Sequence, residues 1–178
     1  MKHICIFCGS SEAVDKKYLE LAKNVGITLG KKGYGIVYGG ARVGMMGAVA
    51  DGALSANAEV IGILPRALQD KEFAHLGLTK LFIVESMAER KQIMFNHSDA
   101  FISLPGGFGT LDELFEIVTW AQVGYHNKKS GILNPNGYWD HLNDFVEHAK
   151  NEGFIRKEHQ LLLHQSSHLD ELLKMLDV

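Results

Sequence analysis

A glycine-rich junction between an apolar run and a helical pattern is the feature that most limits how this chain can fold. Residues 100–104 are apolar, residues 105–109 read Pro-Gly-Gly-Phe-Gly, and a helical pattern starts at Thr110. A strand that turns through glycines directly into a helix is typical of the β-α units of parallel sheets. Such a turn exposes backbone N–H groups at the positive end of the helix dipole, where phosphate binds well. The sequence therefore predicts a strand–loop–helix unit with an anion site at its turn.

The same alternation of short apolar runs and helical patterns continues along the whole chain. The expected strands are 4–7, 34–38, 60–64, 81–84, 100–104, 130–133 and 161–164. The expected helices are 15–32, 43–56, one opening at Ser86, 110–123, 138–151 and 168–176, with 65–79 irregular. This order predicts an α/β fold, a single doubly wound Rossmann-like domain over residues 1–178 with a mostly parallel sheet. In such folds the ligand lies at the carboxyl ends of the strands.

The charge balance argues against a nucleic-acid partner. The chain has 178 residues, with 18 Lys plus Arg against 21 Asp plus Glu, and no basic stripe. No apolar run approaches the length of a membrane span, and the N-terminus is too short and too soon polar for a signal peptide. We therefore expect a cytoplasmic protein that binds neither nucleic acid nor membrane.

Two cysteines, Cys5 and Cys8, stand at the spacing of a C-x-x-C motif. Both fall in or beside an expected strand, where positions three apart point to opposite faces. A structural zinc site needs four ligands, and the sequence offers no second cysteine pair. Buried free thiols are the favoured interpretation over a redox or metal pair, and we expect neither metal nor cofactor.

A second glycine loop, residues 39–44, has the length of a phosphate-binding P-loop. Met45 and Met46 stand where that motif needs Lys and Ser or Thr, so P-loop hydrolysis of ATP is not expected. A tight turn and a ligand contact remain equally open for this loop.

Acidic and basic residues near the glycine loop of residues 105–109 leave alternatives open. Thr110 and Glu113 have the spacing of a capping box, although a cap alone does not need the preceding Pro-Gly-Gly-x-Gly run. A carboxylate beside an anion site favours chemistry on a phosphorylated molecule. Arg90 is either a solvated helix residue paired with a carboxylate or a fixed positive charge in the site.

Together these segments resemble the Lonely Guy (LOG) family. Residues 105–113 match its Pro-Gly-Gly-x-Gly-Thr-x-x-Glu signature. Further matches, in the same order and spacing, are Cys-Gly-Ser at 8–10, Val-Tyr-Gly-Gly at 37–40, Met-Ala-Glu-Arg-Lys at 87–91, Thr-Trp-Ala-Gln at 119–122 and Asn-Glu-Gly-Phe-Ile at 151–155.

The resemblance implies a phosphoribohydrolase that acts on nucleoside 5'-monophosphates. Members cleave the N-glycosidic bond of cytokinin riboside 5'-monophosphates, and often of AMP, and release free base and ribose 5-phosphate. By position it implies catalytic roles for Arg90 and Glu113, and a homodimer with the site near its interface. It implies substrate contacts from Glu72, Lys91, Gly106, Gly107, Gly109, Thr110 and Thr119.

Two rival functions follow from the same residues. One is a non-catalytic module that binds a mononucleotide through the glycine loop. The other is a pyridoxal-phosphate decarboxylase, which needs a lysine for its Schiff base, and Lys91 is the lysine near the motif. A carboxylate and an arginine beside the anion site favour hydrolysis over the binding module, and little else in the chain serves a pyridoxal cofactor.

Overall fold

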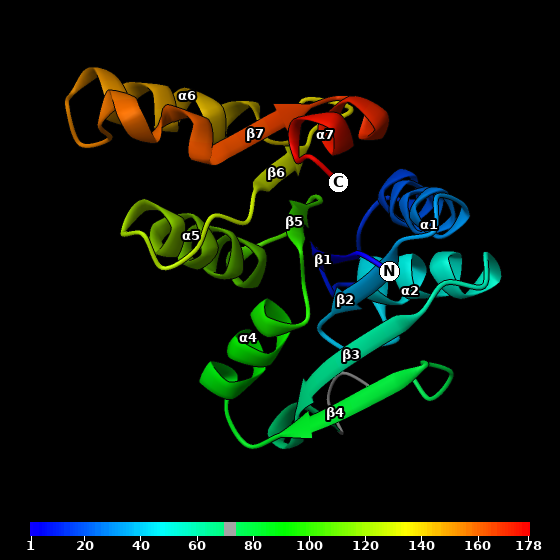
Figure 1. Cartoon of the computed structure of the whole chain (residues 1–178). Helices are drawn as coiled ribbons and strands as arrows, with labels where there is room; N and C mark the ends of the chain where they lie inside the picture. The colour runs from blue at the N-terminus through cyan, green and yellow to red at the C-terminus, as the bar shows by residue number, and fades with distance from the viewer. Residues whose placement is uncertain (70–73) are drawn as a thin grey trace.

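The computed structural model describes residues 1–69 and 74–178 and contains a seven-stranded, entirely parallel sheet (Figure 1). Its strands are β1 (His3–Phe7), β2 (Gly35–Tyr38), β3 (Val60–Pro65), β4 (Lys80–Val84), β5 (Ala100–Ser103), β6 (Ser130–Leu133) and β7 (Leu163–Ser166). The α-helices are α1 (Lys16–Lys31), α2 (Gly44–Ser55), α4 (Met87–Asn96), α5 (Phe108–Gln122), α6 (Asp140–Asn151) and α7 (Leu169–Met175). Short 3-10 turns occupy Arg66–Leu68 and Lys157–Leu162.

The order of the strands places a switch point at the centre of the sheet. From β1 the chain builds β2, β3 and β4 to one side, then returns to place β5, β6 and β7 on the other, in the order β4-β3-β2-β1-β5-β6-β7. β1 and β5 pair directly, with Ile4 opposite Ala100 and Phe7 opposite Ser103. The loops that follow β1 and β5 diverge there, which opens a crevice at the carboxyl ends of the strands.

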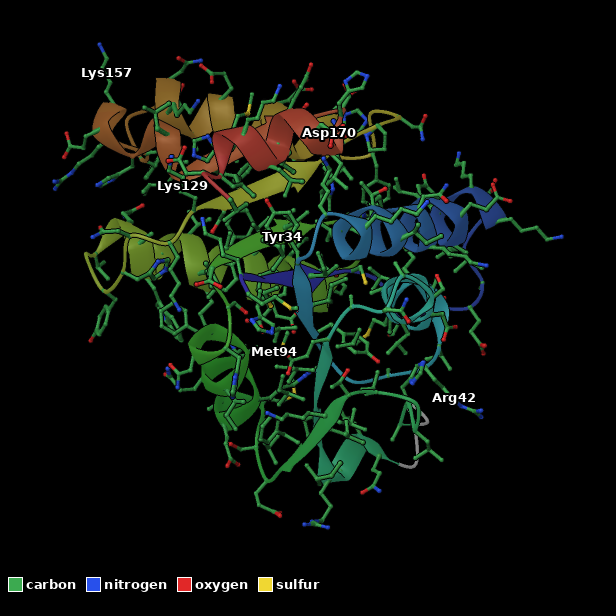
Figure 2. The ribbon with its side chains drawn as sticks, turned by 45° about the vertical axis from the view of Figure 1, so that its right-hand side comes forward. Tyr34, Arg42, Met94, Lys129, Lys157 and Asp170 are labelled. Atoms are coloured by element: carbon green, nitrogen blue, oxygen red, sulfur yellow. The ribbon has the colours of Figure 1, made fainter. Side chains whose placement is uncertain are left out.

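Helices cover both faces of the sheet, because the central strands are apolar on both sides (Figure 1). α1, α2 and α7 pack on one face, where Leu29, Val49 and Leu172 belong to one buried cluster. α4 and α5 cover the other face through Met94 and Ile117. In Figure 2, Met94 lies beside the sheet, whereas the charged ends of Lys157 and Asp170 reach the surface.

The predicted α/β fold is confirmed, and the sheet is parallel throughout. The predicted first residues of two helices, 110 and 138, were wrong. α5 begins at Phe108, because Gly107 takes the cap position and its carbonyl accepts the first helical bond from Leu111 N–H at 3.0 Å. Thr110 is therefore inside the first turn, and its capping box with Glu113 does not form. α6 begins at Asp140, because residues 134–139 form a turn.

The predictions for the Ser86 cap and for the two cysteines are confirmed, whereas the start of the last strand differs. The Ser86 cap is confirmed, since its Oγ accepts the Glu89 N–H at 3.1 Å, although the Glu89 carboxylate bonds the N–H of Glu85. The last strand starts at Leu163, two residues later than expected, because a 3-10 turn precedes it. Cys5 and Cys8 are both buried free thiols. Across residues 1–69 and 74–178, no helix combines the length and the apolarity that a membrane crossing requires.

Candidate active site

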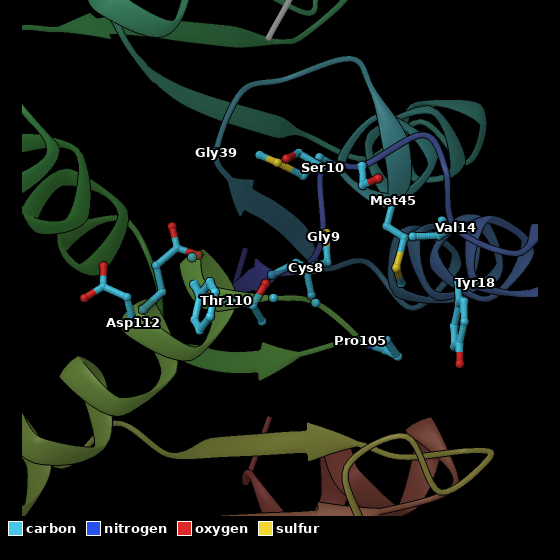
Figure 3. Close-up of a pocket in the computed structure, with 18 of the residues that line it drawn as sticks. Cys8, Gly9, Ser10, Val14, Tyr18, Gly39, Met45, Pro105, Thr110 and Asp112 are labelled. Atoms are coloured by element: carbon cyan, nitrogen blue, oxygen red, sulfur yellow. The ribbon is translucent and has the colours of Figure 1, made fainter. Parts of the chain in front are cut away.

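A cleft of about 390 Å³ lies at the switch point, within the size range of small-molecule sites. The loop after β1, Gly39 after β2, and the loop that joins β5 to α5 form its floor. In Figure 3, Cys8, Gly9 and Thr110 lie together at its centre. Val14, Tyr18 and Met45 line the side formed by α1 and α2, and Asp112 lies on the opposite side. A cleft therefore lies at the carboxyl ends of the strands, where the sequence predicts the ligand to bind.

The glycine loop of residues 105–109 is held by two of its carbonyl groups. Gly9 N–H donates to the Pro105 carbonyl at 3.1 Å, and the Tyr138 hydroxyl donates to the Gly106 carbonyl at 2.8 Å. The first helical bond of α5 ends on Gly107, so the N–H groups of residues 108–110 precede the helical ladder. These donors and the positive end of the helix dipole lie at the turn where the sequence predicts an anion site.

The three glycines of this loop differ in what surrounds them. A Cβ on Gly106 would overlap the Thr110 side chain and come within 3.0 Å of Gly9 N. Among the described residues, a Cβ on Gly107 or on Gly109 would meet no atom within 4 Å beyond its chain neighbours and the backbone of its own helix. Packing therefore requires glycine at position 106, whereas at positions 107 and 109 the folded chain leaves open space beside the cleft.

Arg90 is buried in the cleft wall rather than solvated on a helix face. Its side chain is 7 % exposed, and its Nε and Nη2 donate to the carbonyls of Ile63 and Gly39 at 3.1 and 3.2 Å. The alternative of a surface arginine paired with a carboxylate is thus wrong. A guanidinium stays charged, and two carbonyl anchors fix this one at the ends of β2 and β3. A Cβ on Gly39 would overlap Nη2, so that glycine makes room for the arginine.

Glu113 lies one turn into α5, half-buried, and it also lines the cleft. Its charge reaches the cleft floor: burial first, and then the Glu113 carboxylate, raise the pKa of the Cys8 thiol far above its usual value. Cys8 therefore remains a neutral thiol and adds an apolar surface to the cleft. Arg90 and Glu113, drawn from different elements, thus line the same cavity as the glycine loop.

Other residues implied by the resemblance lie elsewhere. The Lys91 ammonium contacts the carboxylates of Glu116 and Asp112 at 3.0 and 3.2 Å. Burial lowers the pKa of Lys91, but the hydrogen bonds and charges of these two carboxylates outweigh burial and raise it. Thr119 is exposed on the outer face of α5. Glu72 falls outside the described residues.

Sequence reasoning missed several residues that line the cleft. They are Tyr18 of α1, Met45 and Met46 of α2, Met87 of α4, and Tyr138 before α6. The second glycine loop, residues 39–44, could be a tight turn or a ligand contact. Its first residue, Gly39, lines the cleft, whereas Arg42 does not. For Tyr138, the sequence offered one indication: the pattern Asn-Pro-Asn-Gly at residues 134–137 predicts a turn at the carboxyl end of β6, the edge of the sheet where the cleft lies.

A parallel sheet with a glycine-rich helix start at its switch point defines a Rossmann-like protein with an anion-binding loop. The family model described as "Possible lysine decarboxylase" matches residues 46–176. A cytokinin riboside 5'-monophosphate phosphoribohydrolase of Arabidopsis thaliana is 39 % identical over 176 residues, which are 99 % of this chain and 77 % of that protein. One from Rhodococcoides fascians is 44 % identical over 155 residues, 86 % of this chain and 78 % of that protein.

The chain therefore belongs to the LOG family of cytokinin riboside 5'-monophosphate phosphoribohydrolases. Solved structures share its fold at lower identity. A molybdenum cofactor binding protein of Rippkaea orientalis is 21 % identical with a TM-score of 0.73, covering 99 % of this chain and 96 % of that one. The molybdenum cofactor carrier protein of Chlamydomonas reinhardtii is 17 % identical with a TM-score of 0.72, covering 99 % of both chains.

Proposed function

We propose that this protein hydrolyses the N-glycosidic bond of cytokinin riboside 5'-monophosphates, and of AMP, to free base and ribose 5-phosphate. The observation that carries the proposal is the meeting of three groups in one cleft: the N–H donors that open α5, the Glu113 carboxylate and the Arg90 guanidinium. Relatives of about 40 % identity over nearly the whole chain bear that activity in their names.

The phosphate is assigned to the glycine loop and the ribose to the neighbourhood of Glu113. A dianionic phosphate gains from the N–H groups of residues 107–110 and from the helix dipole. A carboxylate in contact with that phosphate would repel it, so Glu113 faces the sugar instead. With the phosphate seated at the helix start, the ribose lies within reach of the first turn, where Glu113 stands.

Cleavage of the bond separates charge, and the two side chains act on it. The bond between ribose C1' and the base nitrogen breaks, its electron pair stays with the base, and positive charge builds on the sugar. Glu113 stabilises that charge and accepts a proton from the water whose oxygen bonds to C1'. Glu113 then gives up that proton, which reaches the departing base and restores the carboxylate. Arg90, held by two carbonyls, supplies fixed positive charge for phosphate or ribose and donates no proton.

The opposing interpretations fit the geometry less well. A non-catalytic mononucleotide module has no use for a carboxylate beside its anion site. A Schiff-base lysine must lose its proton, whereas two carboxylates hold Lys91 as an ammonium and raise its pKa.

The test is Glu113→Gln, which keeps the shape of the side chain and removes its charge. Chromatography follows base release from isopentenyladenosine 5'-monophosphate, AMP and adenosine. We expect base from the monophosphates, little from adenosine, and at least about a 100-fold lower turnover in the variant. Glu20→Gln, an exposed carboxylate on α1, is the matched control. Turnover by Glu113→Gln near that of the unchanged protein contradicts the assigned role, and intact recovery of the monophosphates favours the binding module.

A homodimer is part of the proposal. The outer face of α5 exposes Phe108 at 93 %, Phe115 at 38 % and, just beyond the helix, Val123 at 60 %. Exposed apolar side chains of this size on one helix are typical of a protein interface. Thr119 lies on the same face, so a second copy bound there would bring it close to the interface. Light scattering on the purified protein measures the assembly, and a monomeric mass would contradict this part.

A further inference from the structure

Tyr138 makes a contact that reaches across the cleft to the glycine loop. It belongs to the connection between β6 and α6, yet its hydroxyl donates to the Gly106 carbonyl at 2.8 Å, 32 positions earlier in the chain. Its ring packs edge-on against Tyr18 of α1, with ring centres 5.7 Å apart, and both rings line the cleft. The hydroxyl therefore joins the wall of the cleft to the proposed phosphate seat.

Hydrogen bonds and a buried tryptophan hold the turn that carries Tyr138. The Asn134 amide accepts the N–H of Trp139 at 2.9 Å and donates to the Asp140 carboxylate at 2.7 Å. Gly137 adopts a φ of +70°, and a Cβ there would overlap the Asp140 carboxylate, so the turn requires glycine. Trp139 is 3 % exposed and anchors the turn in a buried cluster with Leu114 and Ile132. The position of the tyrosine is thus fixed by its neighbours before any ligand binds.

The hydrogen bond from Tyr138 holds a peptide unit that has glycine on both sides. The unit between Gly106 and Gly107 is flanked by two residues without a Cβ, so a flip of this peptide meets little steric resistance. In a trans peptide the C=O and the N–H point in opposite directions. Holding the Gly106 carbonyl on Tyr138 therefore fixes the direction of the Gly107 N–H. The Pro105 carbonyl, held by Gly9, fixes the preceding unit in the same way.

We propose that Tyr138 is a positioning residue, which orients the Gly106–Gly107 peptide so that the Gly107 N–H binds the 5'-phosphate of the substrate. This inference rests on the proposed function, since it assigns a part of the same phosphate seat. Without the hydroxyl the peptide populates both orientations, and the phosphate must select the productive one on binding. The loss falls on affinity for phosphorylated ligands, because the Tyr138 hydroxyl acts on the phosphate seat through the Gly106–Gly107 peptide.

The experiment compares Tyr138→Phe, which keeps the ring and removes only the hydroxyl, with the unchanged protein. Calorimetry gives the Kd of ribose 5-phosphate, and steady-state kinetics with isopentenyladenosine 5'-monophosphate give KM and kcat separately. Tyr34→Phe is the matched control, since Tyr34 precedes β2 at the amino end of the sheet, away from the cleft (Figure 2). We expect Kd and KM to rise by about 2- to 10-fold, as the loss of one hydrogen bond predicts, with kcat within about twofold.

Other results overturn the inference in distinguishable ways. An unchanged Kd and KM in an active Tyr138→Phe enzyme refutes the role of the hydroxyl and leaves the proposed function intact. A fall in kcat at constant KM assigns Tyr138 to the bond-breaking step instead. A melting temperature lowered by more than about 5 °C, with Kd unchanged, assigns it to stability alone. If the unchanged protein neither binds ribose 5-phosphate nor releases base, the proposed function falls and this inference falls with it.

Discussion

Substitution of the loop glycines by alanine tests whether each glycine is required for packing of the folded chain or for binding of the ligand. The folded chain leaves open space at Gly107 and Gly109 but not at Gly106. Within α5, Gly109→Ala restricts the unfolded chain and should raise the free energy of unfolding by about 0.4–1 kcal/mol. For a chain of 178 residues this corresponds to a melting temperature about 1–4 °C higher. Gly106→Ala, which overlaps Thr110, should lower stability by about 1–3 kcal/mol.

The effect on activity should have the opposite sign for Gly109→Ala. A phosphate oxygen approaches a backbone N–H to about 2.9 Å, whereas a methyl carbon keeps other atoms at about 3.5–4.0 Å. An added methyl group beside the seat should therefore cost at least about 1.4 kcal/mol of binding, or about tenfold in kcat/KM. Gly107→Ala should lose activity similarly, with a slightly less stable helix start, since alanine is a poorer cap than glycine.

Scanning calorimetry and base release from isopentenyladenosine 5'-monophosphate test the series side by side. A Gly109→Ala protein that melts higher and turns over less would show that the ligand, rather than the fold, needs this glycine. If Gly107→Ala and Gly109→Ala both keep kcat/KM within about twofold of the unchanged protein, the phosphate does not sit on this loop, and the assignment of Glu113 to the ribose loses its basis.

Two further predictions concern buried ionisable side chains. Arg90→Lys keeps the positive charge but cannot bond the Ile63 and Gly39 carbonyls together, so urea unfolding should show a loss of about 1.5–3 kcal/mol and kinetics at least about a tenfold lower turnover; unchanged turnover would return Arg90 to a purely structural role. Burial lowers the pKa of His126, so the unfolded chain binds more protons than the folded chain once the pH falls below about 6.5. The free energy of unfolding should therefore have its full value above that pH and decrease below it. Urea midpoints at pH 7.5 and 5.5 should differ less in His126→Gln, and an equal difference would contradict this account.

The sheet and the position of the cleft follow from local sequence patterns. β1 and β5 are short apolar runs, each followed by glycine within three residues, and such runs can be recognised one at a time. The carboxyl ends of parallel strands share one edge, so the loops of residues 8–11 and 105–109 had to converge. The exact start of α5 could not be predicted in the same way, because Thr and Gly are both acceptable caps and the choice depends on how Thr110 packs beneath Gly106.

Contacts between distant elements account for what the sequence did not reveal. The partners of Arg90, the carbonyls of Ile63 and Gly39, lie 27 and 51 positions away, and no local pattern distinguishes a buried arginine from a solvated one. The bond from Tyr138 to Gly106 likewise needs the packing of two separate β-α connections. Motif residues are therefore found from sequence, while the side chains that hold the motif in place become visible only in the folded chain.

The adjacent residues Arg90 and Lys91 show why resemblance and geometry must be combined. Neighbouring helix positions are rotated by about 100°, so the two side chains leave α4 in different directions. Arg90 lines it, whereas Lys91 turns toward Asp112 and Glu116, on the side of α5 where Thr119 is exposed. If Lys91 and Thr119 touch the nucleotide, as the resemblance implies, the part of the site they belong to lies at the outer face of α5. A second copy packed on that face would enclose it, which ties the proposed substrate contacts of these residues to the proposed dimer.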